Sequence, residues 1–389
     1  MSTPFADHQN SIYLAGLSGR TPDFPIGWRE LEQAGQAAMG AQALGYVAGR
    51  AGAEDTVRAN REAFDGWRIV PRMLRGVPPR RDLSTTLLGT AMSAPVLLAP
   101  VGVLEIVHPE AELATARAAA ATGLVMVVST ASSYAMEEVA KASGDGPRWF
   151  QLYWPKDRAL AASLLRRAEA AGFTAVVVTL DTWQLGWRPR DLTTAYLPFL
   201  QSKGIANYLS DPVFRGALAR TPEEDPTAAV HHWLGLFAEP ELTWDDLAWL
   251  QAHTSLPVVL KGVQHPDDVR RAVDAGVQGI ICSNHGGRQV DGAVGSLDVL
   301  PALVDAADDL PVLFDSGVRT GADALKALAL GASAVLLGRP WVYGLALGGE
   351  AGVSHVLATF LADLDLQLGL SGHRSAGELT TQSLMRRPG

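Results

Sequence analysis

The hydrophobic positions of this chain follow two different patterns, and the change comes near residue 94. Before it, residues 28–39 and 41–47 are rich in helix-forming side chains, and glycines interrupt the chain directly after them. Beyond it, short apolar runs alternate with stretches of helical character. Such alternation is typical of repeated βα units and predicts a parallel sheet. We therefore expect an N-terminal helical region, residues 1–94, packed on a larger α/β domain, residues 95–389.

Eight apolar runs are candidate strands of that sheet. They are residues 95–100, 124–129, 149–152, 175–180, 257–261, 279–282, 311–315 and 334–337. Three similar junctions, AAGFTAVVVTL, DAGVQGIICSN and ALGASAVLLGR, place a glycine where a helix should end: Gly172, Gly276 and Gly331. Eight such units over about 250 residues predict a TIM (β/α)8 barrel. A doubly wound open sheet is the alternative, but no G-x-G-x-x-G follows an early strand.

One long insertion interrupts this rhythm after the fourth predicted strand. Residues 183–241 contain several tryptophans, prolines and histidines. A connection of this length is either functional or disordered, and its aromatic residues argue against disorder. We interpret it as a lid over the barrel mouth. His231 and His232 within it would point apart on a helix or strand and have no evident partner, so we predict no metal site.

The stretch GIICSNHGGRQVDG, residues 279–292, carries the most distinctive candidate chemistry. Its short apolar strand ends in a base, His285, and a cation, Arg288. Gly286 and Gly287 between them allow a sharp turn or a close approach of the backbone to a ligand. Ligands of parallel α/β proteins bind at the carboxyl ends of the strands. Taken alone, however, the stretch is explained about equally well by an ordinary loop whose histidine is only exposed to solvent.

Polar residues also follow most of the other predicted strands. In chain order they are Ser129; Gln151 and Tyr153; Thr179 and Asp181; Lys261; Ser283; Asp315; and Gly338 with Arg339. Individually, Lys261 could be a surface lysine and Asp315 a helix cap. Because the strand ends of a barrel converge on one mouth, their joint occurrence predicts an active site there. The segments 315–321 and 338–340, after the last two strands, predict a phosphate site that includes Gly317 and Arg319.

Composition narrows the classes of protein that remain. The chain has 389 residues and a net charge of −9, which argues against nonspecific nucleic-acid binding. Its single cysteine, Cys282, lies in an apolar strand, so we expect an inert buried thiol, no intramolecular disulfide and a reducing, cytoplasmic location. We find no signal-peptide pattern and no apolar run of the ~18 residues that a membrane span needs, so we expect no membrane partner.

The motifs at the strand ends resemble those of a known family. SNHGGRQ, together with DSGVRTGADALKALALGASAVLLGRP, resembles the FMN-dependent α-hydroxy-acid oxidase and dehydrogenase family. PVGVLEIVHPEAE, FQLYWPKDR and VLKGVQHPDD agree with it, and the resemblance runs from about Tyr13 onward. The segment DTWQLGWRPRDL and the long insertion are most similar to those of lactate 2-monooxygenases.

This resemblance implies roles for the catalytic residues. His285 would be the base that removes a proton from the substrate, and Asp181 would hydrogen-bond to its imidazole and stabilise the cation. Arg188 and Arg288 would hold the substrate carboxylate with their planar donor forks.

The resemblance also implies further contacts to the substrate and to FMN. Tyr46 and Tyr153 would bind the substrate, and Lys261 would stabilise negative charge on the reduced flavin. Ala131 replaces the tryptophan of glycolate oxidase, which implies a roomier substrate pocket. The implied FMN contacts are Pro100, Val101, Gly102, Ser129, Gln151, Thr179, Lys261, Ser283, Asp315, Gly317, Arg319, Gly338 and Arg339, with Asp315 grouped among those at the ribityl phosphate.

The favoured functional hypothesis is an L-lactate 2-monooxygenase, which converts L-lactate and O2 to acetate, CO2 and water. The alternative in the same family is an L-2-hydroxy-acid oxidase or dehydrogenase acting on lactate or mandelate. A catalytically silent, phosphate-binding barrel is the alternative from another class, which the set of His285, Asp181 and Lys261 disfavours. The resemblance implies a small 2-hydroxy acid and O2 as partners, together with other copies of the chain in a homotetramer or homo-octamer.

Overall fold

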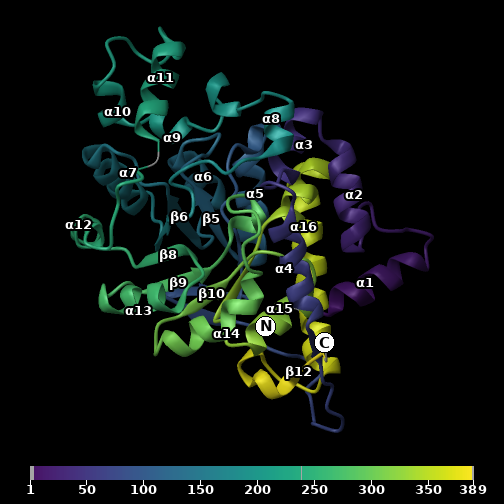
Figure 1. Cartoon of the computed structure of the whole chain (residues 1–389). Helices are drawn as coiled ribbons and strands as arrows, with labels where there is room; N and C mark the ends of the chain where they lie inside the picture. Colours follow the sequence, from purple (N-terminus) through teal and green to yellow (C-terminus); the bar gives the residue numbers. More distant parts are fainter. Residues whose placement is uncertain (1–3, 238, 388–389) are drawn as a thin grey trace.

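The eight predicted strands form a closed parallel barrel. The computed structural model describes residues 4–237 and 239–387 (Figure 1). The barrel closes in the order β10-β11-β4-β5-β6-β7-β8-β9. Its strands are β4 (Val96–Leu98), β5 (Val125–Ser129), β6 (Arg148–Leu152), β7 (Val176–Thr179), β8 (Val258–Val263), β9 (Gly279–Cys282), β10 (Val312–Phe314) and β11 (Ala334–Leu337). Each overlaps one predicted run, so the TIM-barrel prediction is confirmed.

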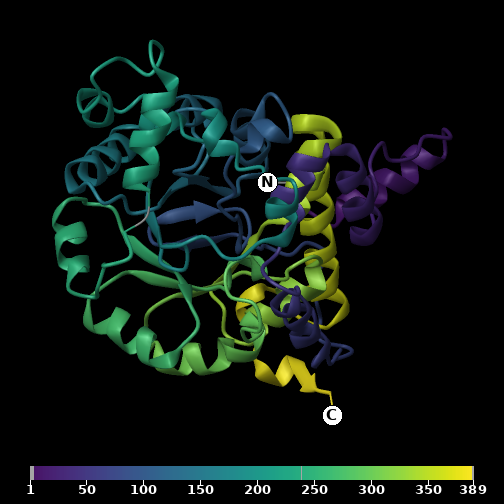
Figure 2. The same cartoon turned by 45° about the horizontal axis from the view of Figure 1, so that its top comes forward.

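Helices surround this barrel and complete the βα units (Figure 2). They are α5 (Ala111–Thr122), α6 (Met136–Ser143), α7 (Arg158–Ala170), α12 (Asp246–Ala252), α13 (Pro266–Asp274), α14 (Ser296–Ala306), α15 (Gly321–Ala329) and α16 (Arg339–Leu370). Gly172, Gly276 and Gly331 follow the ends of α7, α13 and α15 with φ of +72°, +68° and +101°. Glycine adopts this left-handed conformation at little cost, so these three predicted helix ends are confirmed.

The barrel interior is packed, and its amino-terminal end is closed by a hairpin. Inward-facing residues such as Val127, Trp149 and Ile281 pack with Leu87 and Met92 of the hairpin β2 (Thr85–Leu87) and β3 (Thr90–Met92). The Trp149 indole N–H donates to Thr90 Oγ1 at 3.0 Å. A ligand can therefore enter the barrel only at its carboxyl-terminal mouth, where parallel barrels bind their ligands.

The N-terminal region is only partly helical. Its helices are α1 (Asp7–Gly16), α2 (Trp28–Ala38), α3 (Ala41–Ala48) and α4 (Asp55–Asp65), and α2 and α3 match the predicted segments. Residues 67–94, however, contain β1 (Trp67–Ile69) as well as the hairpin. The expectation of a purely helical region is wrong here because β1 pairs with β12 (Leu384–Arg386), a partner from the other end of the chain.

The last barrel helix, α16, is unusually long and apolar. By length and composition it could cross a membrane, but half of the apolar window is buried inside the protein. It packs against α5, α2 and α15, and its backbone leaves helical geometry at Gly348 and Gly349. These contacts are those of a core helix.

Cys282 is also buried, and burial raises the pKa of its thiol well above the usual range, as expected of an inert cysteine.

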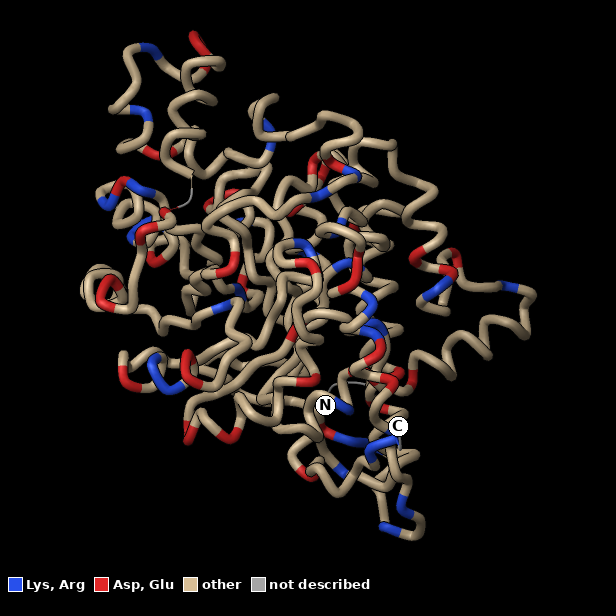
Figure 3. The backbone as a smooth tube through the Cα atoms, in the orientation of Figure 1, with Lys and Arg blue, Asp and Glu red and all other residues tan. Residues whose placement is uncertain are grey.

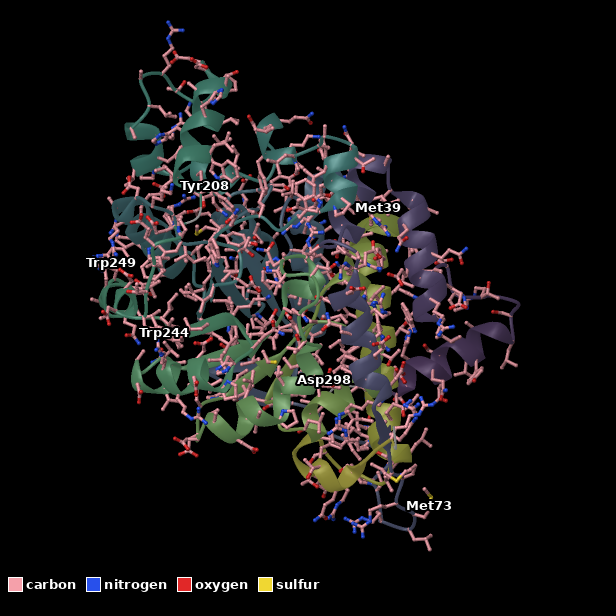
Figure 4. The ribbon with its side chains drawn as sticks, viewed as in Figure 1. Met39, Met73, Tyr208, Trp244, Trp249 and Asp298 are labelled. Atoms are coloured by element: carbon pink, nitrogen blue, oxygen red, sulfur yellow. The ribbon has the colours of Figure 1, made fainter. Side chains whose placement is uncertain are left out.

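The insertion is folded and anchored to the barrel. It contains α8 (Pro189–Thr193), α9 (Ala206–Leu209), α10 (Pro212–Gly216), α11 (Pro226–Leu236) and the 3-10 turn η2 (Pro198–Gln201). The fully buried Asn207 accepts from Met136 N at 2.8 Å and donates to Thr130 O at 3.1 Å. Tyr208, labelled in Figure 4, packs near Trp233 with ring centroids 6.1 Å apart. The aromatic residues thus form a small core, and the segment is ordered, as its aromatic content predicted.

The remaining short elements are 3-10 turns. They are η1 (Leu104–Ile106), η3 (His285–Gly287), η4 (Ala376–Glu378) and η5 (Thr381–Ser383). In Figure 3, acidic and basic segments are scattered along a backbone that is mostly uncharged, and several basic segments lie near the C-terminus. The net charge of −9 is therefore not gathered on one side of this view, and charge selection of a ligand must arise locally, at the mouth.

Candidate active site

The turn η3 places His285 at the barrel mouth in an uncommon backbone conformation. His285 has φ +57°, and the two glycines after it have φ +63° and +72°. A Cβ on Gly286 would lie 3.1 Å from Arg339 Nη1, and one on Gly287 would lie 2.3 Å from a Val57 methyl. The glycines predicted to allow a sharp turn are therefore required by it. Backbone strain of this kind is typical of functional sites.

Asp181 holds the imidazole of His285 in one orientation. Its Oδ1 lies 2.8 Å from His285 Nδ1. The proton of the neutral ring is therefore expected on Nδ1, which leaves Nε2 free to act as a base. Burial lowers the pKa of His285, while Asp181 opposes this effect. Burial alone would raise the pKa of Asp181, but His285 and Lys261 outweigh it, so the pKa is lowered and the carboxylate stays charged.

Two arginines, Arg188 and Arg288, lie on the same pocket wall, and the carboxylate of Asp191 only partly offsets their positive charge. Arg188 is the residue before Pro189, the first residue of α8, and its Nε donates to Arg288 O at 2.9 Å. Arg288 Nη1 donates to Gly49 O at 2.8 Å and also to Tyr46 O. Among the described residues, neither arginine forms an ion pair. Burial, and then the neighbouring Arg288, lower the pKa of Arg188 to about 10. An anion bound between the two guanidinium groups would relieve this repulsion.

Lys261 is buried beside the base and is held by two oxygen atoms. Its Nζ lies 3.0 Å from Asp315 Oδ2 and 2.9 Å from Ser283 Oγ. Burial opposes its charge, but Asp315 and Asp181 outweigh burial and raise the pKa of Lys261. Asp315 therefore pairs with the lysine, and its predicted contact with the ribityl phosphate stays a prediction. A carboxylate there would repel a phosphate, whereas beside Lys261 it keeps a buried cation paired.

The phosphate-binding prediction agrees with the positions of two arginines, Arg339 at the start of α16 and Arg319 just before α15. Arg339 donates to Val47 O and Gly286 O, each at 3.1 Å, and has no carboxylate partner among the described residues. Burial lowers the pKa of Arg339 to about 9, and Arg319 adds to the effect. Arg319 Nε is buried without a partner in the described structure. Arginines at helix N-termini suit a phosphate dianion.

Several predicted cofactor residues lie on the pocket wall, and others lie just behind it. The wall includes Pro100, Val101, Gly102, Ser129, Lys261, Asp315, Gly317, Arg319, Gly338 and Arg339. Gln151 lies behind the wall. Its Oε1 accepts from Ser129 Oγ and its Nε2 donates to Thr179 Oγ1, each at 2.9 Å. Ser283 also lies behind, between Lys261 Nζ and the backbone N–H of His285. Gln151 and Ser283 thus support the pocket wall from behind.

The pocket at the mouth has about 1070 Å³ of empty space, including the part open to solvent. Tyr46, Tyr153, His285 and the two arginines lie close together at one end of it, and Ala131 also lines the pocket. Phe199 and Phe237 from the insertion cover that end, and the ring of Phe237 lies 5.4 Å from that of Tyr153. The insertion therefore contributes to the pocket, as a lid would.

Sequence reasoning did not single out several residues of this site. Leu185, Phe199 and Phe237 reach the pocket from an insertion that has no repeat pattern, so only their aromatic or apolar character could have drawn notice. Thr182 also lines the pocket and lies directly after Asp181, a position that could have been examined. The fully buried Glu112 lies behind the wall in α5 and carried no such signal.

Glu112 ties together two loops that form the pocket wall. Its Oε1 accepts from Ser133 N at 3.0 Å and from Leu104 N at 3.4 Å. These bonds connect the loop after β4, which carries Gly102, to the loop after β5, which carries Ala131. Burial raises the pKa of Glu112 to about 7, although the hydrogen bonds oppose it.

We expect this carboxyl group to make the folded protein less stable as pH rises. Its pKa is about 7 in the folded chain, against the ordinary glutamate value of 4.5, so the unfolded chain loses the proton first. Stability should therefore fall between about pH 4.5 and 7, by up to about 3 kcal/mol. Glu112→Gln should remove this slope, as measured by urea unfolding at pH 5 to 8. The exposed Glu110→Gln is the matched control, and parallel profiles for Glu112→Gln and wild type would contradict the prediction.

Comparison with known proteins identifies the kind of enzyme that carries this site. Residues 35–386 match the FMN-dependent dehydrogenase family. The chain is 44% identical over 387 residues to the FMN-dependent alpha-hydroxy acid dehydrogenase qulF of Penicillium citrinum, covering 98% of this chain and 96% of that one. This chain belongs to the FMN-dependent α-hydroxy-acid dehydrogenase family.

Other members of the family show how far the similarity extends. An L-lactate oxidase of Lysinibacillus sphaericus (strain C3-41) is 43% identical, with 97% of each chain covered. The crystal structure of a mandelate oxidase has a TM-score of 0.82 at 38% identity and covers 94% of this chain and 99% of its own. The chain is thus an FMN-dependent oxidoreductase that acts on 2-hydroxy acids, and the predicted family, fold and cofactor are confirmed.

The residues of the mouth fit FMN at both ends of the cofactor. Arg319 and Arg339, which form no ion pair among the described residues, would hold the phosphate, and the buried, charged Lys261 would lie near the ring. When bound, FMN supplies the two-electron acceptor needed to oxidise an alcohol. Among the described residues, no group of three or more histidine, cysteine or acidic side chains could hold a metal ion.

The protein's own residues then divide the remaining work. Arg188 and Arg288 would bind and orient the carboxylate of the 2-hydroxy acid. His285 Nε2 would take a proton from the substrate, and Asp181 would stabilise the resulting imidazolium. Burial raises the pKa of Tyr153, so its hydroxyl remains protonated and can donate a hydrogen bond to the substrate. Phe199 and Phe237 would keep water from this end of the pocket.

Proposed function

We propose that this enzyme oxidises a small L-2-hydroxy acid such as L-lactate with O2 as electron acceptor. The products are the 2-oxo acid and hydrogen peroxide. The observation that carries the proposal is that Arg188 and Arg288, which form no ion pair among the described residues, lie on the same pocket wall as His285, the partner of Asp181. The relative from Lysinibacillus, which matches this chain over 97% of its length, is named an L-lactate oxidase and supports the choice of acid and acceptor.

The proposal is tested by aerobic turnover of the FMN-loaded enzyme with L-lactate and with L-mandelate. Catalase is added because free peroxide decarboxylates 2-oxo acids in solution. We expect L-lactate to give pyruvate, with one O2 consumed per lactate when catalase is absent. Ala131 leaves room for a larger side chain, so slower turnover of L-mandelate is also expected. A failure of both acids to bleach the flavin anaerobically would refute the proposal.

A second candidate function is oxidation with decarboxylation inside the closed site, as in a lactate 2-monooxygenase. The observation that favours it is the aromatic cover: Phe199 and Phe237 lie 6.1 Å apart over the substrate end, and Phe199 packs on the buried Trp233 at 4.7 Å. Such a cover would slow the release of pyruvate until peroxide has formed. Acetate as the main product in the presence of catalase would favour the monooxygenase over the oxidase.

Opening the aromatic cover should change the fate of the product. Deleting residues 201–230 would also remove the buried Asn207 and Tyr208, so a point substitution is the sharper test. Phe199→Ala should speed release of the 2-oxo acid and raise KM several-fold, since it removes the ring that packs on Trp233 and Phe237. If wild type makes acetate, the variant should make pyruvate and peroxide instead. The neighbouring, exposed Leu200→Ala serves as control, and a Phe199 variant with unchanged KM and products would contradict the role of the cover.

A further inference from the structure

Thr182 lies in the same small cluster as the base and its carboxylate. Its Oγ1 is 3.0 Å from Asp181 Oδ1 and 3.2 Å from His285 Nδ1, and Asp181 Oδ1 is itself 2.8 Å from His285 Nδ1. Thr182 is buried, with 4% of its surface exposed. No role in the mechanism above is assigned to it, although it lines the pocket.

The available hydrogens determine how these three groups share their bonds. Asp181 is ionised and can only accept, so the Thr182 hydroxyl must donate to it. The imidazole Nδ1–H donates to the same Oδ1 at 2.8 Å. The hydroxyl oxygen of Thr182 lies farther from Nδ1, at 3.2 Å, so it can be only the weaker second acceptor of that N–H. Asp181 Oδ2 is buried and has no partner among the described residues. One carboxylate oxygen therefore receives both donors.

A carboxylate with two donors gives less of its charge to each of them. Hydrogen bonds that stabilise a carboxylate make it a weaker base and a weaker acceptor. The imidazolium that forms when His285 takes the substrate proton depends on that acceptor for its stability. Thr182 thus competes with His285 for Asp181, while its hydroxyl also keeps the carboxylate in place beside the ring.

We propose that Thr182 is a positioning residue that sets the basicity of His285 by holding part of the Asp181 charge. This inference rests on the proposed function, in which His285 accepts the substrate proton. Thr182 acts through Asp181 and need not touch the substrate. It restrains the base so that the proton taken from the 2-hydroxy acid can be given up again before the next turnover.

Other charged groups around the ring act in both directions. Asp181, at the end of β7, favours the protonated ring, whereas Lys261 of β8 and Arg188 at the start of α8 disfavour it. The substitution alters none of these three charged residues, and Lys261 and Arg188 form no hydrogen bond to Thr182 among the described residues. A difference between variant and wild type therefore reports the bond from the hydroxyl group to Asp181.

Thr182→Val tests the proposal because valine has the shape of threonine without the hydroxyl. We expect the His285 titration to move to higher pH by roughly 0.5–1 pH unit, since only part of a charge-assisted hydrogen bond is passed to the imidazole. Thr182→Ser keeps a hydroxyl and should keep the wild-type midpoint. The measurement is 15N NMR of histidine-labelled, FMN-loaded enzyme without substrate, with the His285 signal assigned from its absence in His285→Gln.

The pH profile of kcat/KM provides the second measurement. Its acid limb should move to higher pH in Thr182→Val by the same amount, and Thr182→Ser should restore it. A uniform loss of activity at every pH, with an unmoved limb and NMR midpoint, would mean a merely structural role and overturn the proposal, as would a shift to lower pH. If the NMR midpoint moves but no 2-hydroxy acid is oxidised, the proposed function has failed and the control of His285 by Thr182 stands.

Discussion

His285→Gln lowers the rate of 2-hydroxy-acid oxidation by about 100- to 10,000-fold, the usual contribution of a general base, and leaves FMN bound. Glutamine is close to histidine in size but cannot take up a proton near neutral pH. Asp181 and Lys261 stay in place, since the lysine is held by Asp315 and Ser283 and not by the imidazole. The loss should therefore appear in the rate of flavin reduction and not in the cofactor content.

Stopped-flow absorbance under anaerobic conditions measures this rate directly. His231→Gln is the matched control, because it makes the same change at an exposed position in α11 of the insertion. It should behave as wild type. Near-normal flavin reduction by His285→Gln, with FMN fully retained, would show that the histidine is not the base.

Arg288→Lys reduces kcat/KM for the 2-hydroxy acid by roughly 10- to 100-fold, as expected when a charge-assisted hydrogen bond is lost. Arg288 Nη1 is already committed to the carbonyl oxygens of Tyr46 and Gly49, and its guanidinium lies 5.2 Å above the Tyr46 ring. These bonds hold the group so that its other nitrogens can face the substrate. Lysine keeps the charge but has one nitrogen, and it cannot bind the carbonyls of Tyr46 and Gly49 and the carboxylate together.

The effect should lie mainly in substrate affinity, measured from the concentration dependence of anaerobic flavin reduction. Arg190→Lys is the control, because Arg190 lies two residues after Arg188 but pairs with Glu54 at 2.9 Å, away from the pocket wall. An Arg288→Lys enzyme with wild-type affinity would remove this residue from the carboxylate site.

The barrel and most of its mouth could be predicted from residues that are neighbours in the chain. A run such as 279–282 is apolar because a barrel strand is buried on both faces, and the polar residues after it mark the point where the strand leaves the core. Repetition of this pattern predicts that His285, Lys261 and Arg339 meet at one mouth, since parallel strands all end on the same side. The glycines at positions 286 and 287 likewise indicate a local turn, which the structure contains.

Contacts between distant segments could not be read in this way. Nothing near Asp315 indicates that it pairs with Lys261, and nothing near β1 indicates that its partner is β12. The choice depends on which side chains and strands the closed barrel and the chain ends bring into contact. Such pairings depend on the paths of whole loops and helices, which local preferences do not specify.

The insertion shows the same division between local sequence and tertiary structure. Its aromatic content predicts an ordered segment, because such side chains are buried when a chain folds. Which rings reach the substrate end is decided by the anchoring of Asn207 to the loop after β5, which sets Phe199 and Phe237 over the pocket. By itself, then, the sequence determined the barrel, the cofactor and the residue types at its mouth. Only the tertiary structure decided their partners, because hydrogen bonds and packing act over a few ångströms in space and not along the chain.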